Sequence, residues 1–307
     1  MSADLSVIIP TYKRTDSLAR LLSLLMKQEN IVLEIIVVDQ NSEAYFDDDM
    51  QLLLNKVLWI KQPVPNASTA RNRGFLAASA DHVLFIDDDL VPGTDFCKKG
   101  MEVFSTYPAI HSFVPLVYTE AGEEQSVKEA KIKQVSNYAG QDVIFAITDT
   151  ISAAVFFKKH YFIESGGFDE LLFQFAKTAE DQEFFLRMYR KGMQLWFVPT
   201  VKVFHDERVA GGCDLRTEDY WITREKCMKA WAIRYRTISH DGSIKPGDFL
   251  RLLRSCVINL AVLKSGPSYI SKQLRLMQMA ISESGQFFNV HRADYKNKID
   301  KGFLSPV

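Results

Sequence analysis

Short apolar runs alternate with helix-like segments through the first part of this chain. Four runs rich in Val, Ile and Leu have the length and composition of buried strands, at residues 5–10, 33–39, 56–61 and 82–87. Between the first two runs, one apolar helix face is formed by Leu18, Leu21, Leu22, Leu25 and Met26. This alternation predicts an α/β fold, with a mostly parallel sheet covered by helices on both faces. Ligands of such folds bind beyond the carboxyl ends of the strands.

The pattern loosens after residue 95. Residues 68–80 predict a short helix, residues 143–159 further sheet, and residues 195–205 another strand. Residues 118–134 are charged and predict an exposed loop or helix. A helix is predicted over 179–192, ending at Gly192 and burying Phe184, Phe185, Met188 and Tyr189.

The chain becomes helical and basic from about residue 214. We therefore expect an α/β domain over residues 1–213 and a helical C-terminal extension over residues 214–307. The whole chain, with 47% hydrophobic residues, is long enough for a large buried core.

Charge is balanced over the chain but not along it. The 37 Lys and Arg against 38 Asp and Glu argue against a nucleic-acid partner. Residues 224–301 hold 15 basic against 6 acidic residues, a net charge of +9, whereas residues 1–223 carry a net −10. This asymmetry points to an anionic surface or acceptor near the C-terminal part.

The sequence favours a cytoplasmic protein. Its four cysteines, Cys97, Cys213, Cys227 and Cys256, show no paired spacing and are typical of reduced thiols. The N-terminal residues lack the basic start and long apolar run of a signal peptide. The longest apolar stretch, residues 257–263, is too short to span a membrane, so only peripheral contact with the inner face of a membrane stays open.

Two acidic triplets need an explanation, because adjacent like charges repel. Asp47–Asp49 precede an apolar helical segment, where carboxylates interact favourably with the helix dipole and stay solvated. Asp87–Asp89 follow a buried strand, whose alternation aims Asp87 and Asp89 to one side. Converging carboxylates suit Mg²⁺ or Mn²⁺ carrying a diphosphate. The second triplet is therefore the predicted site, and a solvated turn is the alternative.

Arg71 and Arg73 fall in the first turns of the helix predicted at 68–80. Cations are unfavourable there because of the helix dipole, unless an anion lies nearby. A bound diphosphate would favour Arg71 as its partner and leave Arg73 on the surface. Pro10, Thr11 and Tyr12 follow the first strand, where they hold a base or form a plain turn.

Several motifs, taken in order from about Leu5 to about Glu207, resemble the family 2 glycosyltransferases and their nucleotide-sugar-binding GT-A fold. "SVIIPTYKR" is similar to the first strand and nucleotide loop of that family, "EIIVVDQNS" to its second strand, and "FIDDDLVP" to its DXD motif. "NASTARNRGF" resembles the helix beside the nucleotide, and "GGFDE" with "AEDQEFFLR" resembles the acceptor-side segment with its Glu-Asp pair. Gln40 and Asn41 depart from the usual Asp-Gly-Ser, and "FAKTA" replaces the usual glycine before the Glu-Asp pair.

The resemblance implies an inverting transferase that moves a sugar from a UDP- or dTDP-sugar to a saccharide or lipid-linked acceptor. It implies Mg²⁺ or Mn²⁺ at Asp89 and Asp87, with His205 as a further candidate ligand. Asp181 is implied as the general base for the acceptor hydroxyl, with Glu180, Phe168 and Asp169 on the acceptor side. The implied nucleotide-sugar site comprises Pro10, Thr11, Tyr12, Arg14, Asp39, Asn41, Arg71, Asp87 and Asp88.

Other interpretations stay open. Asp181 also fits a capping box that begins at Thr178, and His205 also fits a half-buried histidine at a strand end. An aspartyl-phosphate phosphatase is an alternative function, because Asp87, Asp89 and Val91 match its DxDxV motif. A non-catalytic nucleotide-sugar binder is a further alternative.

The C-terminal extension contains an apolar stripe beside basic residues. Arg251 and Arg254 flank this stripe, which consists of Leu250, Leu253, Val257, Leu260 and Lys264 at near-helical spacing. The extension either packs on the α/β domain or presents its basic face to an anionic membrane or lipid-diphosphate acceptor.

Overall fold

The computed structural model describes residues 2–41, 48–118, 143–148, 150–176 and 180–206, and in the C-terminal part 247, 250, 253–254, 257–258 and 260–304. Contacts within the chain divide it into two units. The first comprises Met1–Glu170, Glu180–Cys213 and Leu304–Val307, and the second comprises Leu171–Ala179 and Asp214–Phe303. The domain boundary expected at residue 213 stays a prediction.

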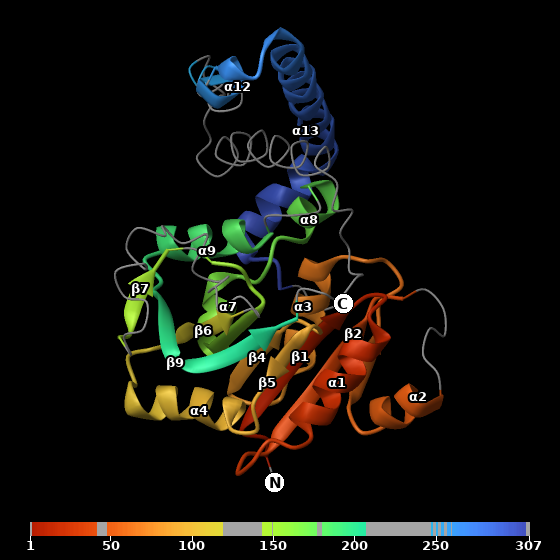
Figure 1. Ribbon diagram of the computed structural model, residues 1–307, viewed down its shortest axis with the longest axis vertical. Helices are drawn as coiled ribbons and strands as arrows, with labels where there is room; N and C mark the ends of the chain where they lie inside the picture. The colour runs from red at the N-terminus through yellow and green to blue at the C-terminus, as the bar shows by residue number, and fades with distance from the viewer. Residues whose placement is uncertain are drawn as a thin grey trace. The chain divides into compact units, whose positions relative to one another are not determined.

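The described strands of the first unit form one sheet of nine strands, in the order β3-β2-β1-β4-β8-β6-β9-β5, with β7 paired to β9 (Figure 1). The strands are β1 (Leu5–Thr11), β2 (Leu33–Asp39), β3 (Leu58–Lys61), β4 (His82–Ile86), β5 (Leu90–Pro92), β6 (Ser112–Tyr118), β7 (Phe145–Ile147), β8 (Ala154–Lys158) and β9 (Leu195–His205). Strands β1 to β4 are parallel to one another, as their alternation with helices predicts. Antiparallel pairs begin where β8 joins β4, in the region where the sequence pattern loosens.

Helices cover both faces of this sheet. They are α1 (Thr15–Leu25), α2 (Asp48–Leu54), α3 (Ala67–Ala77), α4 (Phe96–Thr106), α7 (Lys159–Ser165) and α9 (Glu180–Arg190). Helix α8 (Glu170–Ala176) begins at the last residue of a first-unit segment, and its residues 171–176 belong to the second unit. Alternate residues of β1 point to opposite faces, so Val7 and Ile9 pack with α1 and α4, whereas Ile8 packs with α3, α7 and α9. The predicted α/β class is confirmed.

For α9, the predicted burial of one residue is wrong and the predicted end of the helix is confirmed. Phe184, Phe185 and Met188 of α9 are buried as predicted, but Tyr189 is 56% exposed, so its predicted burial is wrong. Tyr189 lies about 100° further round the helix than Met188 and faces solvent. Gly192 follows the end of α9 with a φ of +77°, in the left-handed region that favours glycine after a helix.

The described part of the second unit contains α12 (Leu260–Lys264) and α13 (Pro267–Lys301). Val257 is buried and packs with Leu253, Ile270, Met277 and Ile281. Leu250 and Leu260, however, are 49% and 76% exposed, so the predicted apolar stripe is not buried along its whole length. Residues 257–258 form a turn and a bend, and this break interrupts the helical spacing. No described helix has the length and hydropathy needed to cross a membrane.

Some predictions fall on parts of the chain that the structure does not describe. Asp48 and Asp49 begin α2, as expected for the first acidic triplet. Residues 119–134, together with Asp47, Thr178, Cys213, Cys227 and Cys256, lie outside the described residues.

Candidate active site

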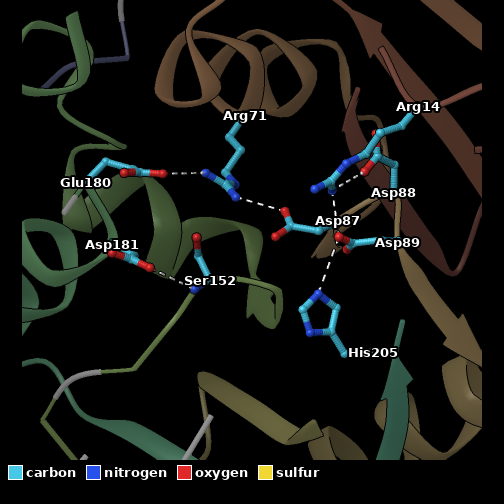
Figure 2. Close-up of polar contacts among 9 residues, drawn as sticks. All are labelled: Arg14, Arg71, Asp87, Asp88, Asp89, Ser152, Glu180, Asp181 and His205. Carbon is cyan, nitrogen blue, oxygen red and sulfur yellow. Dashed lines mark hydrogen bonds and ion pairs between the residues drawn. The ribbon is translucent and has the colours of Figure 1, made fainter. Parts of the chain in front are cut away.

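The second acidic triplet lies in a turn between β4 and β5. Strand β4 ends at Ile86, and the Asp87 amide donates to the Ala153 carbonyl at 2.8 Å, which ties the turn to the start of β8. On the other side the Asp206 amide donates to the Asp89 carbonyl at 3.1 Å. The triplet forms a turn and does not continue the strand. Asp87 pairs with Arg71, whereas Asp88 and Asp89 share Arg14 (Figure 2).

Arg14 lies directly against this turn. It precedes α1, and its Nη1 lies 3.0 Å from Asp88 Oδ1 and 2.6 Å from Asp89 Oδ2. The Thr11 hydroxyl donates to the other oxygen of Asp88 at 2.7 Å. Burial raises the pKa of Asp88 to about 7, with a further contribution from the charge of Asp89, although Arg14 opposes this shift.

Asp89 joins the turn to His205 at the end of β9. Leu90 pairs with His205 across the antiparallel β5 and β9, and His205 Nε2 lies 3.3 Å from Asp89 Oδ2. Burial raises the pKa of Asp89, but the hydrogen bond from His205 and the charge of Arg14 outweigh burial, so the net pKa is lowered.

The donor atoms around Asp89 fit a divalent cation. Asp89 Oδ1 is buried and makes no hydrogen bond, which is costly for a carboxylate oxygen. The carboxylate of Asp87 lies beside that of Asp89 in Figure 2. Among the described residues, no three His, Cys, Asp or Glu side chains lie close enough together to hold a metal ion by themselves. Such a site suits Mg²⁺ or Mn²⁺, which commonly combine one or two carboxylates with phosphate oxygens and water.

Arg71 of α3 connects the turn to α9. Its Nη2 lies 2.9 Å from Asp87 Oδ1, and its Nη1 lies 3.4 Å from Glu180 Oε1. The side chain is only 5% exposed, and its guanidinium carbon lies 5.4 Å from the centre of the Phe168 ring. Figure 2 shows Arg71 between the two acids.

Glu180 and Asp181 are the first two residues of α9. The Asp181 carboxylate accepts from the Gln182 amide at 2.8 Å and from the Ser152 amide at 3.3 Å. Burial raises the pKa of Asp181, and burial together with the charge of Asp181 raises the pKa of Glu180 to about 7. Carboxylates with raised pKa values are suited to general base catalysis near neutral pH.

A second group of polar side chains surrounds Asp39 at the end of β2. Asp39 is fully buried and accepts from the backbone and side chain of Asn41 at 2.9 and 2.7 Å. Its other oxygen accepts from Lys61 Nζ at 2.5 Å. Sequence reasoning missed Lys61, although this residue ends β3 directly opposite Asp39 in the parallel register.

The residues that depart from the family pattern have structural partners. Gln40 Oε1 accepts from the Asn66 amide at 2.8 Å, which ties the end of β2 to the start of α3.

Two predicted nucleotide-loop residues lie at the end of β1 and directly after it. Pro10 is buried in β1, and Tyr12 is half-buried with Lys13 Nζ 5.0 Å from its ring centre.

Asn72 holds the segment that precedes α8. Its Oδ1 accepts from the Phe168 amide, and its Nδ2 donates to the Phe168 carbonyl and to Glu170 Oε1, each at 2.9 Å. Phe168 and Asp169 are fully buried, so the structure does not place either side chain on an open acceptor surface. Phe168 packs among Phe85, Phe162 and Phe184. Sequence reasoning missed Asn72, although it lies in the helix motif already singled out.

Comparison with known proteins places this architecture in a family. The sequence model described as "Glycosyl transferase family 2" matches residues 6–192. A chondroitin synthase of Escherichia coli is 25% identical over 239 residues, which cover 66% of this chain and 34% of that protein. An uncharacterized glycosyltransferase of Haemophilus influenzae is 23% identical, with 61% and 62% covered. A pre-mycofactocin glycosyltransferase of Mycobacterium tuberculosis is 26% identical, with 72% and 45% covered.

The matched region therefore spans between 34% and 62% of the length of these relatives. A solved structure, that of a mannosyltransferase from Pyrobaculum calidifontis in complex with GDP-Man and Mn²⁺, has a similar fold, with a TM-score of 0.54 at 15% identity. The alignment covers 98% of this chain and 84% of that one, which confirms the predicted GT-A-like fold. Because the family model matches well over half of the chain, this protein belongs to glycosyl transferase family 2, as its ordered motifs predict.

Proposed function

We propose that this chain is an inverting glycosyltransferase that moves a sugar from a nucleotide-diphospho-sugar to an acceptor hydroxyl. The observation that carries the proposal is the connection of the acidic turn to the Glu180–Asp181 pair. Arg71 contacts Asp87 on one side and Glu180 on the other. Candidate donor-binding and acceptor-activating groups thus form one set of contacting side chains.

The surroundings of Asp39 support a donor with a lactam base. Asp39 offers a hydrogen-bond acceptor, and Lys61 beside it offers a donor. This pair is compatible with the adjacent N–H and C=O of uracil and thymine, and equally with those of guanine. The Lys61 side chain is 42% exposed and that of Asp39 is 0% exposed, so an entering base would meet Lys61 first. UDP- and dTDP-sugars are the donors that we favour.

Asp89 and Asp87, with His205, would hold Mg²⁺ or Mn²⁺ together with the diphosphate. When bound, such an ion offsets the negative charge that develops on the leaving nucleoside diphosphate. The Pyrobaculum mannosyltransferase, whose structure contains GDP-Man and Mn²⁺, supports this assignment. Arg14 and Arg71 contribute fixed positive charge beside the same carboxylates.

Asp181 is the proposed general base. As the acceptor oxygen forms its bond to the anomeric carbon, the bond from that carbon to the diphosphate breaks and the diphosphate leaves with the electron pair. Asp181 takes the hydroxyl proton. A single displacement of this kind inverts the configuration at the anomeric carbon. The raised pKa of Asp181 favours its role as a proton acceptor.

A saccharide or lipid-linked acceptor completes the proposal. The similarity to a chondroitin synthase supports a saccharide acceptor. The net charge of +9 over residues 224–301 supports an anionic partner, either a lipid-diphosphate acceptor or the inner face of a membrane beside a cytoplasmic enzyme.

The two alternative functions have less support. A phosphatase would use Asp87 or Asp89 as a nucleophile, but Asp87 is ion-paired to Arg71 and Asp89 to Arg14. A non-catalytic binder gives no role to the Glu180–Asp181 pair, whose pKa values are raised.

A product screen tests the proposal. The full chain is incubated with UDP-, dTDP- and GDP-sugars, saccharide acceptors, and Mg²⁺, Mn²⁺ or a chelator, and nucleotide release and product configuration are measured. We expect inverted product that requires a divalent ion. Asp181→Asn should bind the donor normally and lose transfer by at least ~10²-fold. Retained configuration, hydrolysis of an aryl phosphate, or donor binding without turnover would each contradict the proposal.

A further inference from the structure

We propose that Arg71 is a positioning residue that holds Asp87 of the acidic turn and Glu180 of α9 at the same time, and thereby fixes Asp181 for proton transfer. This inference rests on the proposed function and goes beyond the role of Arg71 as a phosphate partner. It assigns to Arg71 an effect on the acceptor-side acids, which a phosphate contact alone does not require.

The guanidinium is well placed for this role. Two of its nitrogens reach carboxylates on different elements, at 2.9 Å from Asp87 and 3.4 Å from Glu180. The side chain is 5% exposed and lies over the face of Phe168, whose backbone is in turn held by Asn72. Arg71 Nε is buried without a hydrogen-bond partner, so the side chain is oriented by its two terminal nitrogens.

The electrostatic surroundings show what Arg71 does for the acids. Glu180 is faced by Arg71 from α3, by Asp87 from the acidic turn, and by Asp181 from its own helix. Asp181 is faced by Arg71 and by the amides of Ser152 and Gln182. Within this described array Arg71 is the cation that opposes the effect of burial at both acids, and at Glu180 it also opposes the repulsion of Asp181 and Asp87.

Two roles for Arg71 make different kinetic predictions. If Arg71 served only as a phosphate partner, its loss would raise the KM for the donor and leave the pH dependence of catalysis unchanged. If Arg71 positions the acid pair, its loss lowers kcat. It also moves the acid limb of kcat/KM to higher pH, because the opposing cation is gone.

Lysine cannot replace arginine fully at this position. A planar guanidinium presents several donors in a fixed fork and can bridge two carboxylates, whereas an ammonium acts as a single charged point. Arg71→Lys should therefore keep the charge and recover only part of the activity that Arg71→Met loses.

The experiment compares Arg71→Lys and Arg71→Met with Arg73→Met as a matched control. Arg73 lies two residues away on α3, is half-buried, and donates to the Lys61 carbonyl. For Arg71→Met we expect kcat to fall about 10²-fold, the scale of a misplaced catalytic group, with the acid limb moved to higher pH. Arg71→Lys should fall between Arg71→Met and the unaltered protein, and Arg73→Met should match the unaltered protein.

A second measurement does not depend on catalysis. Because the folded-state pKa of Glu180 is raised, the folded protein binds more protons than the unfolded chain, and this contribution to stability declines as pH rises toward about 7. Removing Arg71 raises that pKa further. The melting temperature of Arg71→Met should therefore fall more steeply between about pH 5 and pH 8 than that of Arg73→Met.

The outcomes separate the hypotheses. A higher donor KM, with an unmoved acid limb and an unchanged pH dependence of melting, would overturn the inference and leave a phosphate contact. If Arg71→Met does not fold, Arg71→Lys and Glu180→Gln are combined, and additive effects of the two on kcat would overturn it as well. If the unaltered protein transfers no sugar from any donor, the proposed function fails, whereas the melting experiment still tests the link between Arg71 and its two carboxylate partners, Asp87 and Glu180.

Discussion

Nη1 of Arg14 lies 2.6 Å from Oδ2 of Asp89, so a cation of the chain itself shares the carboxylate that we assign to a metal ion. Both side chains are nearly buried, at 10% and 6% exposure, and water screens their interaction little. A divalent ion without nucleotide must bind against this positive charge. We expect Arg14→Gln to tighten Mn²⁺ binding about tenfold, equivalent to about 1.4 kcal/mol, in calorimetric titrations without nucleotide.

Lys99→Gln is the control for the Arg14 variant. Lys99 is half exposed on α4 and pairs with Asp95. Lys99→Gln therefore removes one positive charge at a position outside the acidic turn. The affinity for Mn²⁺ should not change. Weaker Mn²⁺ binding in Arg14→Gln would contradict the prediction and show that Arg14 helps to hold the ligands of the ion.

The two acidic triplets should respond differently to neutralisation. Asp89→Ala removes the buried carboxylate beside His205 and should abolish the metal-dependent part of UDP binding, measured by calorimetry with and without Mn²⁺. Asp48→Asn with Asp49→Asn alters exposed residues in the first turn of α2 and should cost about 0.3–1 kcal/mol of stability per residue while transfer stays near normal. A large loss of transfer in the second variant would place the site at the other triplet.

The pH dependence of transfer should show the raised pKa values of the Glu180–Asp181 pair. A general base acts when deprotonated, so kcat/KM should rise with pH and level off above about 7, the pKa of Glu180. Adjacent acids lose their protons in two coupled steps, so the limb belongs to the pair as a whole. A flat profile down to about pH 5 would show that Asp181 and Glu180 are not coupled to the catalytic step.

The sequence was informative wherever one local pattern decides the outcome. Strands β1, β2 and β4 are buried on both faces, so each appears as a continuous apolar run with a sharp polar end, and Asp39 and Asp87 follow directly from those ends. The contact between Arg71 and Glu180 joins residues 109 positions apart and depends on where α9 packs, which no local pattern contains. Likewise, the burial of Phe168 depends on three aromatic side chains from other elements.

Gly74 should be a sensitive position because α3 packs closely on the sheet. A Cβ atom built there would overlap the side chain of Ile8 and lie 3.3 Å from Val38 Cγ2. We expect Gly74→Ala to destabilise the protein by about 1–3 kcal/mol, measured as a lower urea midpoint. Gly247→Ala is the control, because a Cβ at this exposed helical position meets no atom within 4 Å. Equal effects of the two substitutions would contradict the close approach of α3 to β1.

The basic C-terminal part should bind anionic membranes reversibly. Residues 224–301 carry a net charge of +9, so we expect attachment through charge and partial insertion of amphipathic helices. Each basic residue near such a surface contributes about 1 kcal/mol, and salt screens this attraction. We expect co-sedimentation with anionic vesicles at low salt, less at high salt, and none with neutral vesicles.

A pair of matched variants locates the surface that binds. Lys272→Gln with Arg275→Gln removes two exposed charges from α13 and should weaken binding to anionic vesicles, by an amount that shrinks as salt is added. Lys98→Gln with Lys99→Gln removes two exposed charges from α4 in the first unit and should leave binding unchanged. Equal, negligible sedimentation with anionic and neutral vesicles would contradict the membrane proposal, and the basic helices would then serve packing or oligomerisation.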